Sequence, residues 1–177
     1  MENRKLKLEE LNRADIEEFK DQKKFPVVIL LDNVRSALNV GSVFRTCDAF
    51  AIEELVLCGI TATPPNKDIM KTALGATESV KWKKFDDTIK SIEYYKNNGY
   101  KIFALEQAEN TFFLNDFNFK EHSKIALVFG NEVEGVQQDI IDLCDAVIEI
   151  PQFGTKHSLN ISVSAGIAIW EVVKKIK

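Results

Sequence analysis

The stretch that decides the fold reads V-V-I-L-L-D-N-V-R-S-A-L-N-V-G-S-V-F-R and runs from Val27 to Arg45. Its first part, Val27–Leu31, is entirely apolar, which is typical of a strand that is covered on both faces. A polar loop follows, and the apolar residues of Gly41–Phe50 then recur at helical spacing. A buried strand that leads through a short loop into a helix predicts the repeating unit of an α/β fold.

The same alternation continues outward from this stretch. Strands are expected at Leu55–Cys58, Val80–Phe85, Lys101–Leu105, Ile125–Phe129 and Ala146–Ile150. Helices are expected at Ile69–Leu74, Asp87–Asn98, Val136–Leu143 and about Leu159–Lys175. The pattern predicts an α/β fold with a parallel-rich sheet and helices on both faces. Ligands of such sheets bind beyond the carboxyl ends of the strands, so the loops after Leu31, Leu105, Phe129 and Ile150 are candidates for a site.

The chain divides at about residue 25. Residues 6–21 carry Leu8, Leu11 and Phe19 at helical spacing among many charges, which predicts an amphipathic surface helix. We therefore expect a helical N-terminal extension over residues 1–25. The rest of the 177-residue sequence, residues 26–177, is expected to form a single domain.

Composition limits the possible functions. The formal net charge of −4 argues against a nucleic-acid partner, although short basic clusters leave a local basic surface open. Three separated cysteines make a disulfide framework or a zinc site improbable and fit a reducing compartment. The first ten residues contain no apolar segment, and no apolar run is long enough for a bilayer. We expect a cytoplasmic protein without a membrane anchor.

Three loops contain residues that could form a site. In the first, Asn39 could cap the following helix, Gly41 and Ser42 leave room for another backbone or a phosphate, and Arg45 could point to the same end. The second holds Asn131 and Glu132 between Gly130 and Gly135, where glycine permits close approach of a ligand. The third runs from Ile150 to Ser162 and offers Ser158 as a helix cap and Asn160 at the start of an apolar helix. Each loop taken alone is equally compatible with a plain turn or cap.

Several common sites are excluded by the same segments. Val136 and Gln137 stand where a Walker A loop needs Lys and Ser or Thr, and no G-x-G-x-x-G dinucleotide fingerprint occurs. The segment Ser162–Gly166 lacks the first glycine of a hydrolase nucleophile elbow.

Taken in order, the three loops resemble the motifs of the SpoU branch of the SPOUT RNA methyltransferases. The motifs are N-V-G-S-V-F-R at Asn39–Arg45, V-F-G-N-E-V-E-G at Val128–Gly135 and I-P-Q-F-G-T-K-H-S-L-N-I-S-V at Ile150–Val163. The resemblance covers roughly residues 26 to 175. One departure is Val133, where the family usually has glycine.

The resemblance implies a fold, a cofactor and an assembly. The sheet would carry a C-terminal trefoil knot, which is a rare feature. S-adenosyl-L-methionine would bind in the knot, RNA (tRNA slightly favoured over rRNA) would be the substrate, and the protein would be a homodimer in which Arg45 of one subunit faces the knot of the other. The implied cofactor-binding residues are Leu105, Glu106, Gly130, Asn131, Gly135, Ile150, Pro151, Ser158 and Leu159.

The implied reaction is methyl transfer to a ribose 2′-hydroxyl. Arginine stays protonated at accessible pH, so we expect Arg45 to fix the target phosphate rather than to act as a base. Asn39 would orient the ribose or Arg45, and Glu132 would hold the loop by accepting hydrogen bonds from backbone or from Asn39. Ser158 and Asn160 would lie beside the sugar, and no metal is required.

Three other functions remain open from the sequence. The fold could serve a non-catalytic RNA-binding protein, a methyltransferase that modifies a base, or a dinucleotide oxidoreductase, and the missing glycine fingerprint argues against the last.

Overall fold

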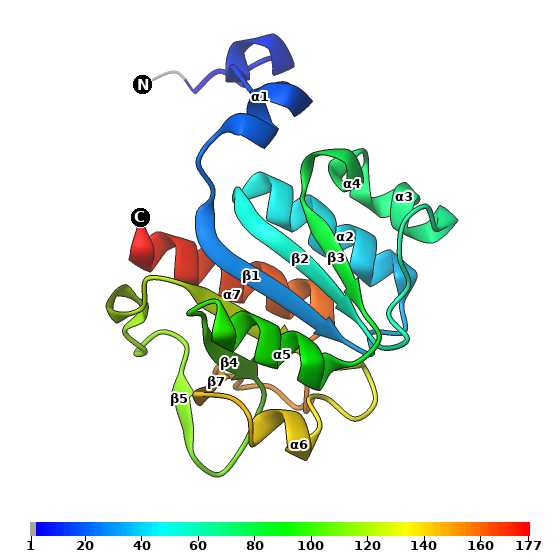
Figure 1. Ribbon diagram of the computed structural model, residues 1–177. Coiled ribbons are helices and arrows are strands. Elements are labelled where there is room, and N and C mark those ends of the chain that lie inside the picture. The colour runs from blue at the N-terminus through cyan, green and yellow to red at the C-terminus, as the bar shows by residue number, and fades with distance from the viewer. Residues whose placement is uncertain (1–2) are drawn as a thin grey trace.

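The protein is built on one sheet (Figure 1). The computed structural model describes residues 3–177 of the chain. The strands are β1 Phe25–Asp32, β2 Ile52–Cys58, β3 Trp82–Phe85, β4 Lys101–Leu105, β5 Thr111–Phe113, β6 Ile125–Phe129 and β7 Ala146–Glu149. Their order is β3-β2-β1-β6-β4-β7-β5, and all the pairings between these neighbours are parallel. The predicted α/β class with a parallel sheet is confirmed.

Helices cover both faces of this sheet. The longer ones are α2 Ala37–Ala49, α5 Thr88–Asn97 and α7 Ile161–Ile176. Successive residues of a strand point to opposite faces. Accordingly, Val28 and Leu30 of β1 pack in a core shared with α5, whereas Ile29 packs in a second core shared with α2 and α7. Figure 1 shows α5 in front of the sheet and α7 behind it.

Two short helices, α3 Lys67–Ala73 and α4 Ala76–Ser79, pack against α2. The approach of α3 is close because a Cβ on Gly41 would lie 2.3 Å from the carbonyl oxygen of Ile69. The hydroxyl of Thr72 also donates a hydrogen bond to the Leu38 carbonyl at 2.8 Å. Gly41 therefore makes room for another backbone, which is one of the two uses predicted for it.

The start of α2 differs from the prediction. Ser36, not Asn39, caps the helix, and its hydroxyl accepts a hydrogen bond from the Asn39 backbone N–H at 3.3 Å. The prediction that Asn39 is the cap is wrong because a serine one turn earlier takes that role. As a result, the amide side chain of Asn39 is available for contacts outside the helix.

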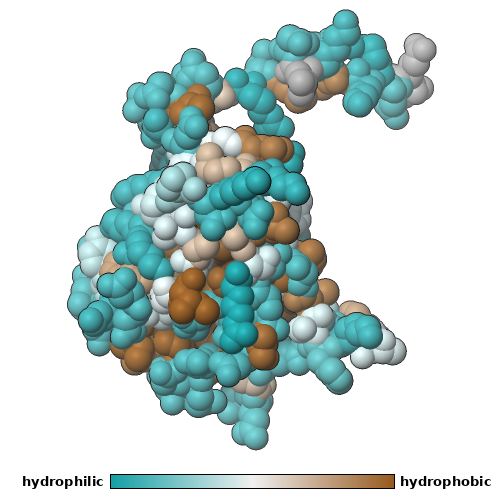
Figure 2. Space-filling view, turned by 90° about the vertical axis from the view of Figure 1, so that its right-hand side faces the viewer, coloured by the Kyte–Doolittle hydropathy of each residue, from teal (hydrophilic) through white to brown (hydrophobic). Residues whose placement is uncertain are grey.

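The N-terminal segment does not form the single helix predicted over residues 6–21. A 3₁₀ turn at Leu8–Leu11 and helix α1 at Ile16–Asp21 are separated at Asn12, whose φ of +46° is left-handed. Asp15 starts α1 with a reciprocal capping box to Glu18. The segment projects from the rest of the molecule in the space-filling view (Figure 2), and its helix α1 contacts α4.

Two further elements differ near the carboxyl ends of the strands. The helix predicted at Val136–Leu143 is only α6, Gln138–Ile141, because the Val136 N–H is bonded to the Glu106 carboxylate at 2.9 Å and remains in the loop. The segment between Leu105 and Ile125, where the sequence predicted no strand or helix, contributes the edge strand β5 and a 3₁₀ turn at Phe119–Glu121.

Candidate functional site

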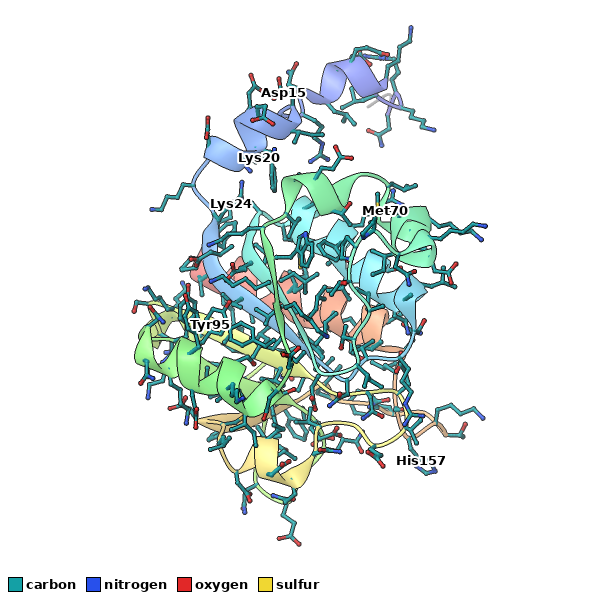
Figure 3. All side chains as sticks on the ribbon, turned by 45° about the vertical axis from the view of Figure 1, so that its right-hand side comes forward. Asp15, Lys20, Lys24, Met70, Tyr95 and His157 are labelled. Atoms are coloured by element: carbon teal, nitrogen blue, oxygen red, sulfur yellow. The ribbon has the colours of Figure 1, made fainter. Side chains whose placement is uncertain are left out.

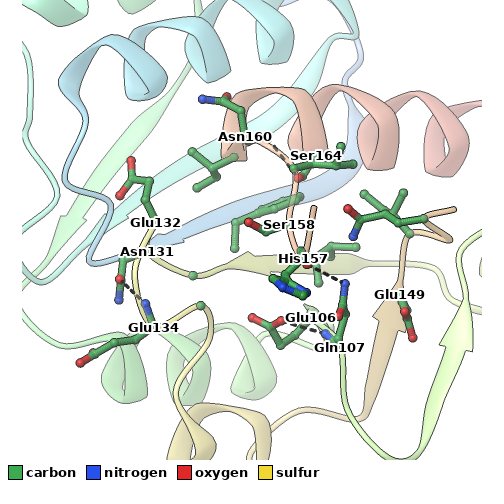
Figure 4. Close-up of a pocket in the computed structure, with 18 of the residues that line it drawn as sticks. Glu106, Gln107, Asn131, Glu132, Glu134, Glu149, His157, Ser158, Asn160 and Ser164 are labelled. Carbon is green, nitrogen blue, oxygen red and sulfur yellow. Dashed lines mark hydrogen bonds between the residues drawn. The ribbon is translucent and has the colours of Figure 1, made fainter. Parts of the chain in front are cut away.

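A cavity of about 550 Å³ lies at the carboxyl ends of β4, β6 and β7 (Figure 4). Its position beyond these strand ends agrees with the prediction for a parallel sheet. Its volume is within the range of small-molecule sites. The lining residues are Leu105, Glu106, Gln107, Phe129–Gly135, Ile148–Ile150, Gln152, His157–Ile161 and Ser164.

Gly130 and Gly135 form a wall of the cavity that only glycine allows. Asn131 and Gly135 pair as an isolated antiparallel bridge, with N–H to carbonyl distances of 3.2 and 3.0 Å. A Cβ on Gly130 would lie 1.9 Å from the carbonyl carbon of Gly135. Gly135 itself has a φ of +67°, which a residue with a side chain rarely adopts. The two glycines therefore close this loop on itself.

The same loop is held by a side chain of its own and by one from a neighbouring strand end. The Asn131 carbonyl oxygen Oδ1 accepts hydrogen bonds from the N–H groups of Val133 and Glu134, both at 2.9 Å. From the neighbouring strand end, Glu106 accepts the Val136 N–H at 2.9 Å. Val133 itself has no positive φ, and its side chain is 69% exposed, so valine fits where the family usually has glycine.

Glu132 joins the first and second motifs. Its carboxylate accepts the backbone N–H groups of Arg35 and Ser36 at 3.0 and 3.2 Å. It also accepts the side-chain N–H of Asn39 at 3.1 Å. Burial acts to raise the pKa of Glu132, but these hydrogen bonds outweigh it and hold the pKa below its ordinary value. The predicted contacts of Glu132 with backbone and with Asn39 are confirmed.

Asn160 brings the third motif to the same point. Its side-chain N–H donates to Asn39 Oδ1 at 3.2 Å, and its own Oδ1 accepts the Ser162 N–H at 2.9 Å. Asn160 is thus the cap of α7, and the prediction that Ser158 is the cap is wrong. Ser158 lines the cavity instead, two residues before the helix cap. The chain Glu132–Asn39–Asn160 ties three loops together that lie far apart in the sequence.

The cavity is acidic. Four carboxylates line it, from Glu106, Glu132, Glu134 and Glu149, and lysine and arginine are absent from its lining. Such a lining favours a cationic ligand and disfavours a phosphate. An acidic cavity at this place does not argue against RNA binding elsewhere on the surface.

Arg45 lies outside the cavity of its own chain. The predicted homodimer, in which Arg45 of one subunit faces the knot of the other, stays a prediction. Arg45 lines a second hollow of about 510 Å³ between α2 and α3. The reason is helical geometry: six residues separate Arg45 from Asn39, which places it about 9 Å further along the helix and on another side. Figure 3 shows Met70, which marks α3, well apart from His157, which marks the loop beside the cavity.

Most of the predicted site residues lie at the cavity. The predicted cofactor-binding residues line it with the exception of Pro151, which is absent from the lining. Sequence reasoning missed Gln107, Glu134, Glu149, Gln152 and Ser164. All but Ser164 lie beside a predicted strand end or inside a predicted motif, so a wider window around each strand end would have included them. His157 also lines the cavity, and its backbone carbonyl accepts a hydrogen bond from the Gln107 side chain at 3.1 Å.

Over residues 3–177 we find no group of three or more His, Cys, Asp or Glu side chains placed to hold a metal ion. Within the same range, each helix is too short or too polar to cross a bilayer.

The geometry can be compared with known proteins. The model of the SpoU rRNA Methylase family matches residues 26–170, which contain all three motifs. The chain belongs to this family. An uncharacterized tRNA/rRNA methyltransferase of Borreliella burgdorferi is 32% identical over 164 residues, which are 91% of this chain and 69% of that protein. A Staphylococcus aureus protein of the TrmH family is 30% identical over 92% of this chain. This SpoU chain spans 66% of the S. aureus protein's length.

Solved structures of the family share the fold. The A. aeolicus TrmH/SpoU tRNA modifying enzyme superposes with a TM-score of 0.80 at 26% identity, over 90% of this chain and 80% of that one. An AdoMet-bound rRNA methyltransferase of Sinorhizobium meliloti gives the same TM-score of 0.80 at 24% identity, over 88% of this chain and 59% of that one. The second likeness concerns the fold alone. The family assignment implied by the three motifs is confirmed.

Proposed function

We propose that this SpoU protein transfers a methyl group from S-adenosyl-L-methionine to a ribose 2′-hydroxyl of RNA, with tRNA favoured slightly over rRNA. The observation that carries the proposal is the hydrogen-bonded chain Glu132–Asn39–Asn160, which joins the three family motifs at the edge of one cavity. The cellular site of the reaction would be the cytoplasm, as the cysteine pattern suggests.

The cavity suits S-adenosylmethionine in size and in charge. Its volume of about 550 Å³ and its carboxylate lining fit a folded nucleoside that carries a sulfonium and an ammonium group. Gly130 and Gly135 allow the ligand to approach the backbone closely. When bound, the cofactor supplies an electrophilic methyl group and leaves as a neutral thioether. In this proposal the chain passes through a trefoil knot where the second and third loops meet.

The residues of the chain would align the nucleophile and assist loss of its proton. Alignment can supply several kcal/mol, on the order of 7–11 at best. Asn39 would orient the ribose or Arg45, and Ser158 and Asn160 would lie beside the sugar. The hydrogen bonds of Asn39 with Glu132 and Asn160 support this arrangement. Arg45 would bind the target phosphate through two N–H groups, which lowers the pKa of the neighbouring 2′-hydroxyl. The phosphate or a second acceptor would then take the proton.

A homodimer would bring Arg45 to a cavity. Val163, Ile167 and Trp170 of α7 are exposed and lie at i, i+4 and i+7, so they form one apolar stripe. Trp170 packs edge-on against Phe50 at 5.8 Å, and Phe50 also lines the Arg45 hollow. A twofold contact over this stripe would place each hollow beside the partner subunit. Light scattering of Trp170→Lys against the unchanged protein tests this assembly.

The proposed reaction is tested by mapping the methyl group. The protein is incubated with labelled cofactor and total RNA from a strain that lacks the gene, and the RNA is digested to nucleosides. We expect the label in a 2′-O-methyl nucleoside. Label in a methylated base would replace the ribose assignment with base modification, and RNA binding without transfer would indicate a non-catalytic RNA-binding protein.

A further inference from the structure

The hollow around Arg45 contains a second cation. Lys71 of α3 faces the same space, and the remaining lining residues are Ser42, Thr46, Ala49, Phe50, Thr72 and Leu74. The lining includes no carboxylate, in contrast to the cavity at the strand ends. A space with two cations and no acid favours an anion.

Neither cation is neutralised by its own chain. Within residues 3–177, Arg45 and Lys71 are exposed and form no ion pair or side-chain hydrogen bond. Other lysines do pair where an acid is near, as Lys101 does with Asp145 at 2.7 Å. Both positive charges therefore remain available to an external partner.

The two helices that carry the cations are packed closely together. Gly41 lets α3 approach α2 so closely that a Cβ there would lie 2.3 Å from the Ile69 carbonyl oxygen. The hydroxyl of Thr72, next to Lys71, donates a hydrogen bond to the Leu38 carbonyl of α2 at 2.8 Å. This packing fixes the backbone positions from which both side chains reach the same hollow.

Apolar groups complete the hollow. Leu74 is 67% exposed and Phe50 half-buried, and both stand beside the cations. A nucleic-acid backbone alternates phosphates with the carbon-rich faces of its sugars, and this combination of charge and apolar surface suits it. A free inorganic anion would make no use of the apolar wall.

We propose that Lys71 binds a phosphodiester of the RNA substrate adjacent to the phosphate held by Arg45, so that the α2–α3 hollow sets the path of the RNA backbone into the site. The inference rests on the proposed function and extends it to a residue outside the three motifs. Lys71 would act on RNA affinity, whereas the chemical step would depend on Arg45.

The test compares Lys71→Gln with Lys67→Gln, a matched lysine at the start of the same helix that does not line the hollow. Binding of an RNA substrate is measured against salt concentration for both variants and for the unchanged protein. For Lys71→Gln we expect about tenfold weaker binding near 0.1 M salt and a log–log salt slope reduced by about 1. We expect Lys71→Arg to restore both, with kcat at saturating RNA and the Kd for S-adenosylmethionine unchanged.

Three outcomes would overturn the inference. Equal behaviour of Lys71→Gln and Lys67→Gln would show that the hollow does not guide the RNA. A change in the mass of the assembly in solution for Lys71→Gln would assign Lys71 to the contact between two copies of the chain. A loss of kcat with unchanged affinity would place Lys71 in the chemical step. Failure of the proposed function would look different, because the unchanged protein would then transfer no methyl to RNA.

Discussion

The cavity at the strand ends and the hollow between α2 and α3 have opposite charge. Four glutamates and no lysine or arginine line the first, whereas Arg45 and Lys71 and no carboxylate line the second. A net charge describes a whole chain, but a ligand meets only one surface. The −4 balance that argued against RNA at the level of composition is consistent with a cationic cofactor in one place and an anionic polymer in another.

The largest expected effect is that of replacing Arg45, which should reduce methyl transfer and leave cofactor binding in the cavity unchanged. For Arg45→Ala we expect methyl transfer to fall by about 100-fold or more, because two charge-assisted hydrogen bonds to a phosphate are each worth roughly 1.5–3 kcal/mol. Arg45→Lys keeps the charge but loses the fork, so its activity should fall about tenfold. Calorimetry should give an unchanged Kd for S-adenosylmethionine in both. Activity of Arg45→Lys near that of the unchanged protein would contradict two-pronged binding.

A side chain added to the wall of the cavity should weaken cofactor binding and leave RNA binding unchanged. Gly130→Ala would place a methyl 1.9 Å from the Gly135 carbonyl carbon, so the loop must move and the cavity wall is lost. We expect cofactor binding at least tenfold weaker by calorimetry, with RNA binding retained. Gly154→Ala is the matched control because a Cβ there meets nothing within 4 Å. Equal cofactor affinity in the two variants would show that the ligand does not contact the Gly130–Gly135 wall.

Removing the charge of Glu132, which links the loops through its hydrogen bonds, should lower the thermal stability in a pH-dependent way. The hydrogen bonds to Glu132 hold its pKa below the ordinary value of 4.5. The stabilisation is therefore fully present above about pH 4.5 and is lost as the pH falls through the lowered pKa. Glu132→Gln should lower Tm by about 2–4 °C at pH 7, as expected for roughly 1 kcal/mol in a chain of this size.

The same Tm measurements at lower pH provide the control. The difference between Glu132→Gln and the unchanged protein should shrink below pH 4. A constant difference from pH 7 to pH 3 would mean that the charge of Glu132 does not matter for the link.

The smallest effect concerns the acidic lining itself. The attraction between an exposed carboxylate and a cationic ligand is weak in water. We therefore expect Glu134→Gln to weaken S-adenosylmethionine binding by only about two- to threefold at low salt. S-adenosylhomocysteine, which lacks the sulfonium charge, should be affected less. Calorimetry at 0.02 M and 0.5 M salt measures both ligands. Equal losses for the two ligands would show that Glu134 contributes shape and not charge.

The three motifs could be found from the sequence because each combines residues that serve a local backbone need with residues that serve chemistry. Gly130 and Gly135 are required by a loop that folds back on itself, and Asn131 by the turn inside that loop. Helix starts were less certain, since Ser36 and Asn39, like Ser158 and Asn160, are all good caps. Which member of each pair caps the helix depends on where the preceding loop is anchored.

The sequence by itself determined the parallel α/β class, the strands other than β5 and the family, because apolar periodicity and short motifs are local properties. Only the tertiary structure decided that Asn39 meets Glu132 and Asn160, that Arg45 lies in a separate hollow beside Lys71, and that the glutamates gather at the strand ends. The physical reason is that these contacts join residues up to 121 positions apart. Their distances follow from how the sheet and helices pack.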